Sequence, residues 1–236
     1  MRNTWTIAAK EWNTYFVSPI AYVLIAAFLV ITGYFFSLIV FYTREASLRG
    51  LFHNMAIILL LISPALTMRL LAEERRMGTI ELLLTSPVRD WEMVLGKFLA
   101  SLALFAIMLS LTFSYPLILK LFGTPDPGPL LSGYLGIFLL GGAFLSAGLF
   151  TSSLTQNQIV AAILGFGLVL ILWLADLASG FLSTSWRGFF EYLALSSHFD
   201  DFTKGIVDTG NVIYYLSIMA AFLFLSTRAL ETQRWR

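Results

Sequence analysis

The chain has 236 residues, of which 58% are hydrophobic and only 12% are charged, and its formal net charge is +1. Soluble domains are typically about 45–50% apolar and about 25% charged, so this composition excludes an ordinary soluble domain and indicates an integral membrane protein. The near-neutral charge argues against a nucleic-acid partner, and the absence of cysteine excludes disulfides and cysteine-based metal or catalytic sites.

Residues 3–16 predict an amphipathic helix ahead of the first hydrophobic run. Its apolar stripe is formed by Trp5, Ala9, Trp12 and Phe16. Because tryptophan favours the headgroup region of a bilayer, we expect an interfacial helix on the cytoplasmic leaflet. The alternative is a simple lead-in to the first span.

Uncharged apolar runs of about 20 residues predict six membrane-spanning helices. Their expected bounds are about 19–42, 50–71, 98–120, 130–151, 159–182 and 209–228. The polar segment TSSLTQNQ (151–158) separates the fourth span from the fifth, and Pro64 is expected to kink the second. Because a bilayer admits only helices or closed barrels, and barrel-like alternation is absent, the expected fold class is an all-α membrane protein. We expect a single transmembrane domain over residues 1–236.

Six spans place both termini on one side of the membrane. Ten basic residues fall on that side: Arg2, Lys10, Arg69, Arg75, Arg76, Arg89, Lys97, Arg228, Arg234 and Arg236. Five fall on the other: Arg44, Arg49, Lys120, Arg187 and Lys204. Since Lys and Arg concentrate in cytoplasmic segments, both termini are expected in the cytoplasm.

The outer segment 183–210, between the fifth and sixth spans, is expected to hold short helices. One apolar stripe predicts the first of them: Trp186, Phe189, Phe190 and Leu193. Asp200 or Asp201 is expected to cap a second helix. A metal site at His198 and these carboxylates is the weaker alternative, because one histidine with scattered aspartates is a poor ligand set.

Motifs that would give the chain its own energy source or catalytic site are absent from the sequence. There is no G-x-x-x-x-G-K-[ST] loop for nucleotide phosphates, no H-E-x-x-H and no G-x-S-x-G. The spans hold no paired carboxylates or rows of arginine, which argues against a proton-driven transporter or a voltage sensor. We therefore expect no enzyme activity, cofactor or metal in this chain.

The most charged stretch is AEERRMGTIELLLTSPVRDWEMVLGK (72–97), hereafter the charged loop, which the expected topology places in the cytoplasm. Arg69 and Glu73 are spaced i, i+4, so they are expected to pair where the second span leaves the membrane. Gly78 is expected to end that helix.

A second, short helix is expected over residues 80–86 of the charged loop. Thr79 is its expected N-cap, and Pro87 ends it because the residue before proline leaves the α region. Asp90 is then expected to cap the helix of the third span. The apolar face of the short helix belongs to no span, so it either lies on the headgroups or docks on another protein.

The segment PALTMRLLAEERRMGTIELLLTSPVRDWEMVLGKFLA (64–100) resembles the first cytoplasmic loop of type-2 ABC exporter permeases. The likeness is greatest to the gliding-motility-like and copper-processing-like branches. It extends to KEW (10–12), SSLTQNQIVAAI (152–163) and YLALSSHFDDFTKGIVDTGNVIYYL (192–216). The resemblance implies a permease in the inner (plasma) membrane of a prokaryotic cell, paired with a second copy or with a related permease.

The resemblance also implies a separate cytoplasmic ABC ATPase subunit, in two copies, that binds ATP and Mg and drives export of an unknown substrate. The short helix of the charged loop then corresponds to the coupling helix that contacts this ATPase. The ATPase-coupling residues carried over by position are Glu73, Glu74, Arg75, Arg76, Gly78, Thr79, Glu81, Leu82, Leu83, Leu84 and Pro87. The alternative is a component of an ABC-like complex that transmits force or supports assembly and passes no substrate itself.

Overall fold

The computed structural model describes residues 2–79, 88–179 and 184–234, and these residues form helices without any strand. In chain order the helices are α1 (Arg2–Val17), α2 (Pro19–Thr43), α3 (Arg49–Thr67), α4 (Ala72–Arg76), α6 (Asp90–Leu111), α7 (Ser114–Phe122), α8 (Pro127–Leu154), α9 (Gln158–Ser179), α10 (Thr184–Leu193), α11 (Leu195–Lys204) and α12 (Thr209–Arg234). Six helical segments of this part of the chain are long and apolar enough to cross a membrane. The prediction of an all-α membrane protein with six spans is confirmed.

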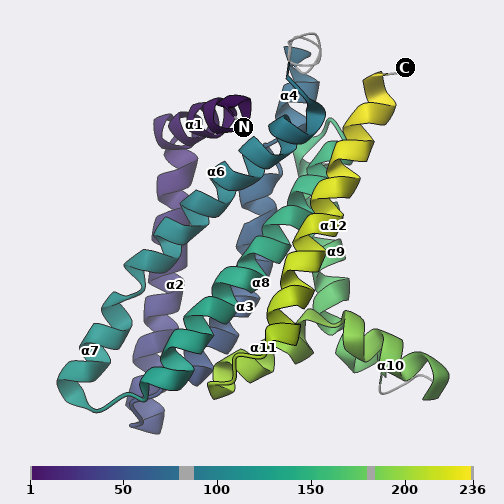
Figure 1. The fold of residues 1–236 in the computed structure, drawn as a ribbon. Helices are drawn as coiled ribbons and strands as arrows, with labels where there is room; N and C mark the ends of the chain where they lie inside the picture. Colours follow the sequence, from purple (N-terminus) through teal and green to yellow (C-terminus); the bar gives the residue numbers. More distant parts are fainter. Residues whose placement is uncertain (1, 80–87, 180–183, 235–236) are drawn as a thin grey trace.

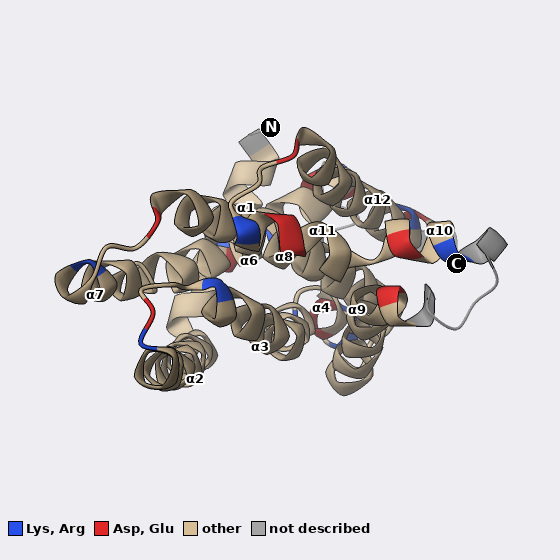
Figure 2. Cartoon of the chain, turned by 90° about the horizontal axis from the view of Figure 1, so that it is seen from below, with Lys and Arg blue, Asp and Glu red and all other residues tan. Residues whose placement is uncertain are grey.

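The helices form a bundle with two distinct ends (Figure 1). At one end α1 lies across the bundle, and α4 and the last turns of α12 lie at the same end, so both termini and the base of the charged loop share one end of the bundle. At the opposite end lie α7, α10 and α11, and α10 projects away from the bundle. Viewed from that opposite end, the spans are mostly tan, and the blue and red of charged residues gather in the connecting segments and short helices (Figure 2).

Helix α1 has one face packed on the bundle and one exposed face that carries both apolar and polar side chains. Thr4 and Ala8 are buried, and α1 packs against α6. Trp5 instead exposes 73% of its surface, as expected for a tryptophan that reaches lipid headgroups. The predicted stripe is therefore divided: Trp12 and Phe16 are partly buried and pack against the core, whereas Trp5 and Ala9 are exposed.

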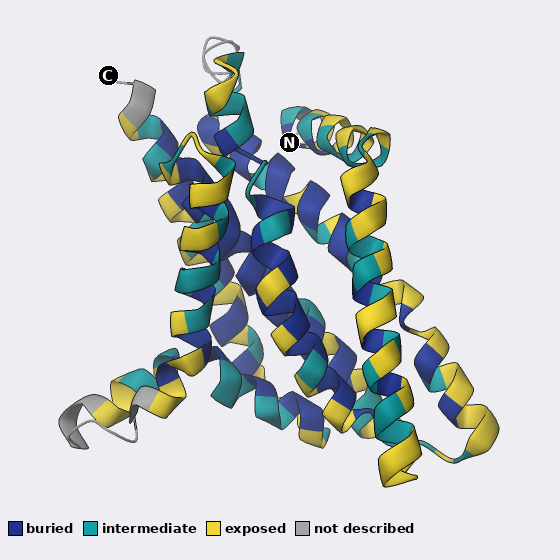
Figure 3. Ribbon diagram, turned by 180° about the vertical axis from the view of Figure 1, so that it is seen from behind, coloured by how far each residue is buried: buried dark blue, intermediate teal, exposed yellow. Residues whose placement is uncertain are grey.

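The core is built around α8, which contacts α3, α6, α9, α11 and α12. In the most apolar 18-residue stretch of α8, 78% of the residues are buried, against 17% in the corresponding stretch of α2 and 22% in that of α12 (Figure 3). Glycines allow this burial, because a Cβ at Gly141 would come within 2.3 Å of the Phe105 ring. A Cβ at Gly148 would come within 2.1 Å of Thr67 Oγ1 and 3.0 Å of Thr67 Cβ. Small residues thus bring α8 close to α3 and α6, as they do in other membrane helices.

We expect Gly148→Ala to destabilise the bundle by about 1–3 kcal/mol, because the added methyl overlaps a threonine that is itself buried. The matched control is Gly167→Ala in α9, where a Cβ would meet nothing within 4 Å. The control should be neutral or stabilising by up to about 1 kcal/mol, since alanine favours helix more than glycine does. Thermal unfolding of both variants in detergent micelles measures the difference, and equal midpoints would contradict the close contact of α8 with α3.

Two predicted elements differ in the structure. The helix of the third span begins at Asp90, next to its expected start, but it is interrupted after Leu111 before α7 starts at Ser114. The first outer helix lies where its stripe predicts it, at Thr184–Leu193. The second begins at Leu195, with Ala194 as its N-cap, so the prediction that Asp200 or Asp201 caps it was wrong.

Candidate functional site

The second span ends in a break that begins the charged loop. α3 ends at Thr67, a turn covers residues 68–71, and α4 follows. We call residues 68–76 the loop base. Because the N–H of Leu70 donates to the carbonyl of Thr67, the carbonyl of Leu66 loses its usual helical partner. The break therefore leaves backbone groups that other elements must satisfy.

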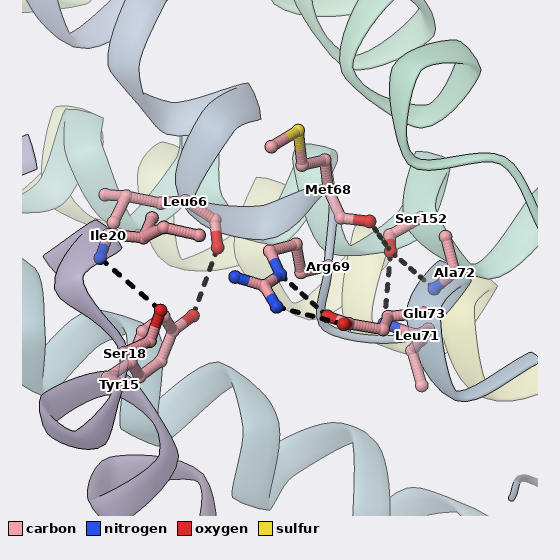
Figure 4. Close-up of polar contacts among 10 residues, drawn as sticks. All are labelled: Tyr15, Ser18, Ile20, Leu66, Met68, Arg69, Leu71, Ala72, Glu73 and Ser152. Atoms are coloured by element: carbon pink, nitrogen blue, oxygen red, sulfur yellow. Dashed lines mark hydrogen bonds and ion pairs between the residues drawn. The ribbon is translucent and has the colours of Figure 1, made fainter. Parts of the chain in front are cut away.

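Tyr15 of α1 supplies one of these partners (Figure 4). Its hydroxyl donates to the carbonyl of Leu66 at 3.1 Å. Burial, together with the negative charge of Glu11, raises the pKa of the Tyr15 phenol well above its usual value. The hydroxyl therefore keeps its proton, and this link between α1 and the end of α3 holds across the physiological pH range.

Ser152, near the end of α8, supplies the others (Figure 4). Its hydroxyl accepts hydrogen bonds from the backbone N–H groups of Leu71 and Ala72, both at 3.1 Å, and donates to the carbonyl of Met68 at 3.1 Å. Leu71 is the N-cap of α4 and makes no side-chain cap of its own. One serine of a different helix therefore does what an N-cap residue normally does.

Charged side chains of the loop base make further contacts. The expected pair is confirmed: Nε and Nη2 of Arg69 donate to the two carboxylate oxygens of Glu73, at 2.7 and 2.9 Å. Such two-point contacts fix orientation as well as distance. Nη1 of Arg75 donates to the carbonyl of Ser153 at 2.7 Å, which ties α4 to the end of α8 a second time. The loop base is thus held rigidly against α8.

The far end of α4 points away from these contacts. Gly78 has a φ of +70°, a conformation that favours glycine, and it ends α4, although the helix predicted to run from the second span to Gly78 is interrupted at residues 68–71. Arg76 and Met77 are exposed, and the hydroxyl of Thr79 donates to the carbonyl of Glu74 at 3.2 Å. A charged, solvent-facing tip therefore follows a base that is fixed to the bundle.

A buried lysine lies beneath the loop base. Lys97 of α6 exposes 1% of its side chain, and its Nζ lies 2.7 Å from Glu11 Oε1 of α1 and 2.8 Å from Glu74 Oε1 of α4. Buried charges are stable only when they are paired. The three side chains, hereafter the Lys97 cluster, therefore hold α1, α4 and α6 together at one point.

The start of α6 is fixed by a second set of contacts with α1. Arg89, rather than Asp90, is the N-cap of α6, and its backbone N–H donates to Glu92 Oε2 at 3.2 Å. Asn3 Nδ2 donates to the same oxygen at 3.2 Å. The capping role predicted for Asp90 was therefore wrong by one residue, because the carboxylate of Glu92 reaches back to Arg89 in a capping-box contact.

A family model described as ABC-2 family transporter protein matches residues 5–233, which run from α1 to the last turns of α12. The chain belongs to the ABC-2 transporter family. It is a multi-pass membrane permease subunit of an ABC transporter, and this family implies a partner ATPase subunit. No curated protein matches the chain.

In this ABC-2 permease, the structure describes only part of the predicted coupling site. Six of its residues lie in or next to the loop base: Glu73, Glu74, Arg75, Arg76, Gly78 and Thr79. The predicted short helix, and with it Glu81, Leu82, Leu83, Leu84 and Pro87, lies outside the described residues. The described part shows how the loop would be anchored, and the contact with an ATPase remains a prediction.

Sequence reasoning missed three residues of the permease that organise this region: Glu11, Lys97 and Ser152. A signal for Lys97 was present, because a lysine at the start of an apolar span needs a partner. Ser152 carried no such signal, since serines are common at the ends of spans.

The weaker alternative of a metal site near His198 is not supported. The described residues contain no group of three or more His, Asp or Glu side chains that could hold a metal ion. His198 stacks on Tyr214 with ring centroids 3.8 Å apart, and Asp201 accepts a hydrogen bond from Asn211 Nδ2 at 3.0 Å. These side chains are engaged in packing α11 against the start of α12.

Proposed function

We propose that this permease couples ATP hydrolysis by a separate cytoplasmic ABC ATPase to export of a substrate across the inner membrane of a prokaryotic cell. Two ATPase copies bind ATP and Mg, and two permeases, either identical or related, form the membrane part. Both termini and the charged loop face the cytoplasm. The sequence carries no P-loop motif for nucleotide phosphates, so in this proposal the permease obtains the energy of ATP through its contact with the ATPase.

The anchoring of the loop base is the observation that carries this proposal. An exposed surface loop normally has few ties to its domain. Here α4 is capped by Ser152, bonded to α8 through Arg75 and joined to α6 through Lys97. A loop that is rigidly attached to several spans transmits a displacement of its tip to them.

The mechanism follows from the difference in free energy between two conformations. ATP binding favours the state in which the two ATPase copies are close together. The size of this shift in population is set by how much more tightly ATP binds to that state than to the other. In the proposed mechanism the docked charged loops follow the ATPases. Each loop base then tilts α3 and α6, the spans on either side of it, and opens the path outward.

We expect Leu83→Glu to abolish association with the ATPase while the chain still inserts into the membrane. A carboxylate on the apolar face of the predicted coupling helix cannot be buried against a partner without a large desolvation cost. The permease, tagged at its C-terminus and expressed in its native host, is purified with and without the change. The eluate is then tested for Mg-dependent ATPase activity and for a protein with a nucleotide-binding motif.

Leu121→Glu is the matched control, because Leu121 is exposed at the end of α7, on the opposite side of the bundle. It should retain the ATPase activity of the unaltered permease. Undiminished ATPase activity in the Leu83→Glu eluate would refute the coupling role of the predicted helix.

A further inference from the structure

The Lys97 cluster joins three elements that are distant in the sequence. Glu11 comes from the interfacial helix, Glu74 from the loop base and Lys97 from the third span. Each carboxylate exposes 13% of its side chain, so all three charges are largely withdrawn from water. One ammonium group serves two carboxylates, which gives the cluster a net charge of −1.

The cluster is not arranged for stability alone. The second oxygen of Glu74, Oε2, is buried and has no hydrogen-bond partner among the described residues. Replacing a buried ion pair by well-packed apolar residues is often neutral or stabilising, so such a pair is poor evidence of a stabilising role. Its effect here is geometric, since the position of Lys97 Nζ depends on α1 and α4 at the same time.

The α1 side of the cluster is rigid, because α1 packs on α6 with almost no space between their backbones. A Cβ at Gly96 would come within 2.9 Å of Ile7 Cβ and of the carbonyl oxygen of Thr4. Gly96 immediately precedes Lys97, so the lysine leaves α6 at the point of closest approach to α1. A displacement of Lys97 therefore moves α1 and α6 together.

We propose that Lys97 is a positioning residue that couples α1 energetically to α4, so that the interfacial helix moves with the charged loop. The role in coupling rests on the proposed function. The physical link between α1 and α4 does not, because all three of its side chains belong to the permease. In this proposal α1 transmits the movement of the charged loop in addition to lying at the membrane surface. Because energetic coupling is reciprocal, weakening the cluster from the α1 side should loosen α4, and weakening it from the α4 side should loosen α1.

Hydrogen–deuterium exchange on the full chain in lipid nanodiscs tests this link without any ATPase. Glu11→Gln removes one charge and keeps the side-chain volume. We expect amide exchange within residues 72–79 to become about tenfold faster, although the substitution lies in α1, because a local opening equilibrium is shifted. Glu74→Gln should accelerate exchange in the second half of α1, which carries Glu11, to a similar extent.

Glu231→Gln is the matched control, since Glu231 makes an exposed ion pair with Arg228 near the end of α12. It should leave exchange in α1 and α4 unchanged. Unchanged exchange in residues 72–79 of Glu11→Gln would overturn the inference. An equal acceleration in α4 and in the core helix α8 would also overturn it, because Glu11 would then affect only global stability. Neither result touches the proposed function, which depends on ATPase association.

Discussion

Lys97→Met is expected to destabilise the permease by about 3–5 kcal/mol, because it leaves two buried carboxylates without their shared cation. Methionine retains most of the side-chain volume of lysine, so the measured loss of stability reports the missing charge and not a new cavity. Denaturant unfolding in mixed micelles, followed by tryptophan fluorescence, measures the change. Lys10→Met is the matched control: Lys10 is exposed on α1, and its replacement should change stability by less than about 0.5 kcal/mol.

A triple variant sharpens this expectation. Glu11→Gln and Glu74→Gln, added to Lys97→Met, neutralise the whole cluster and should restore most of the lost stability, since no unpaired charge remains. Equal instability of the single and triple variants would show that Lys97 contributes through packing and not through its charge.

Ser152→Ala is expected to cost about 2–3 kcal/mol, because two buried backbone N–H groups and one carbonyl lose the hydroxyl that satisfies them. The loss should be local. Limited proteolysis within the charged loop should accelerate, and association with the ATPase should weaken, while α8 itself still folds.

Ser217→Ala is the matched control for that result. The hydroxyl of Ser217 is exposed and donates only to the carbonyl of Ile213 within α12, so no other helix depends on it. Identical protease sensitivity of the charged loop in both serine variants would contradict the capping role of Ser152.

Elements that depend on hydropathy and local spacing could be predicted from the sequence. The six spans follow from apolar runs, and the Arg69–Glu73 pair follows from the i, i+4 geometry of a helix. The end of α4 at Gly78 follows from the tolerance of glycine for positive φ. In each example the physical cause lies within the helix itself or directly beside it in the sequence.

Elements that depend on tertiary partners could not be predicted in this way. The cap of α4 comes from Ser152, 80 residues away along the chain, and Glu11 and Lys97 are 86 residues apart. No periodicity in the sequence marks such pairs. A search for the partner of each lysine and serine near a predicted span end would have raised these residues as candidates, without identifying which residues they contact.

The break between α6 and α7 in the third span depends both on a local sequence signal and on a tertiary contact. Pro116 lacks an N–H, so it cannot satisfy the carbonyl of Thr112 as a helix would require. That carbonyl instead accepts hydrogen bonds from the backbone N–H of Tyr115 at 3.0 Å and from the hydroxyl of Tyr134, on α8, at 2.9 Å. The proline was a usable local signal for the end of α6, but the hydrogen bond that stabilises the break was not visible in the sequence.

Helix α8 is hydrogen-bonded to other elements near both of its ends. Ser152 holds the loop base at one end, and at the other Ser132 Oγ donates to the carbonyl of Phe202 in α11 at 2.6 Å. With 28 residues, α8 is about 42 Å long, which exceeds the thickness of the hydrocarbon layer. One helix therefore connects the loop base directly to α11 at the opposite end of the bundle. A displacement of the loop base would reach α11 through α8 alone, and the close glycine contacts of α8 would carry the same displacement to α3 and α6.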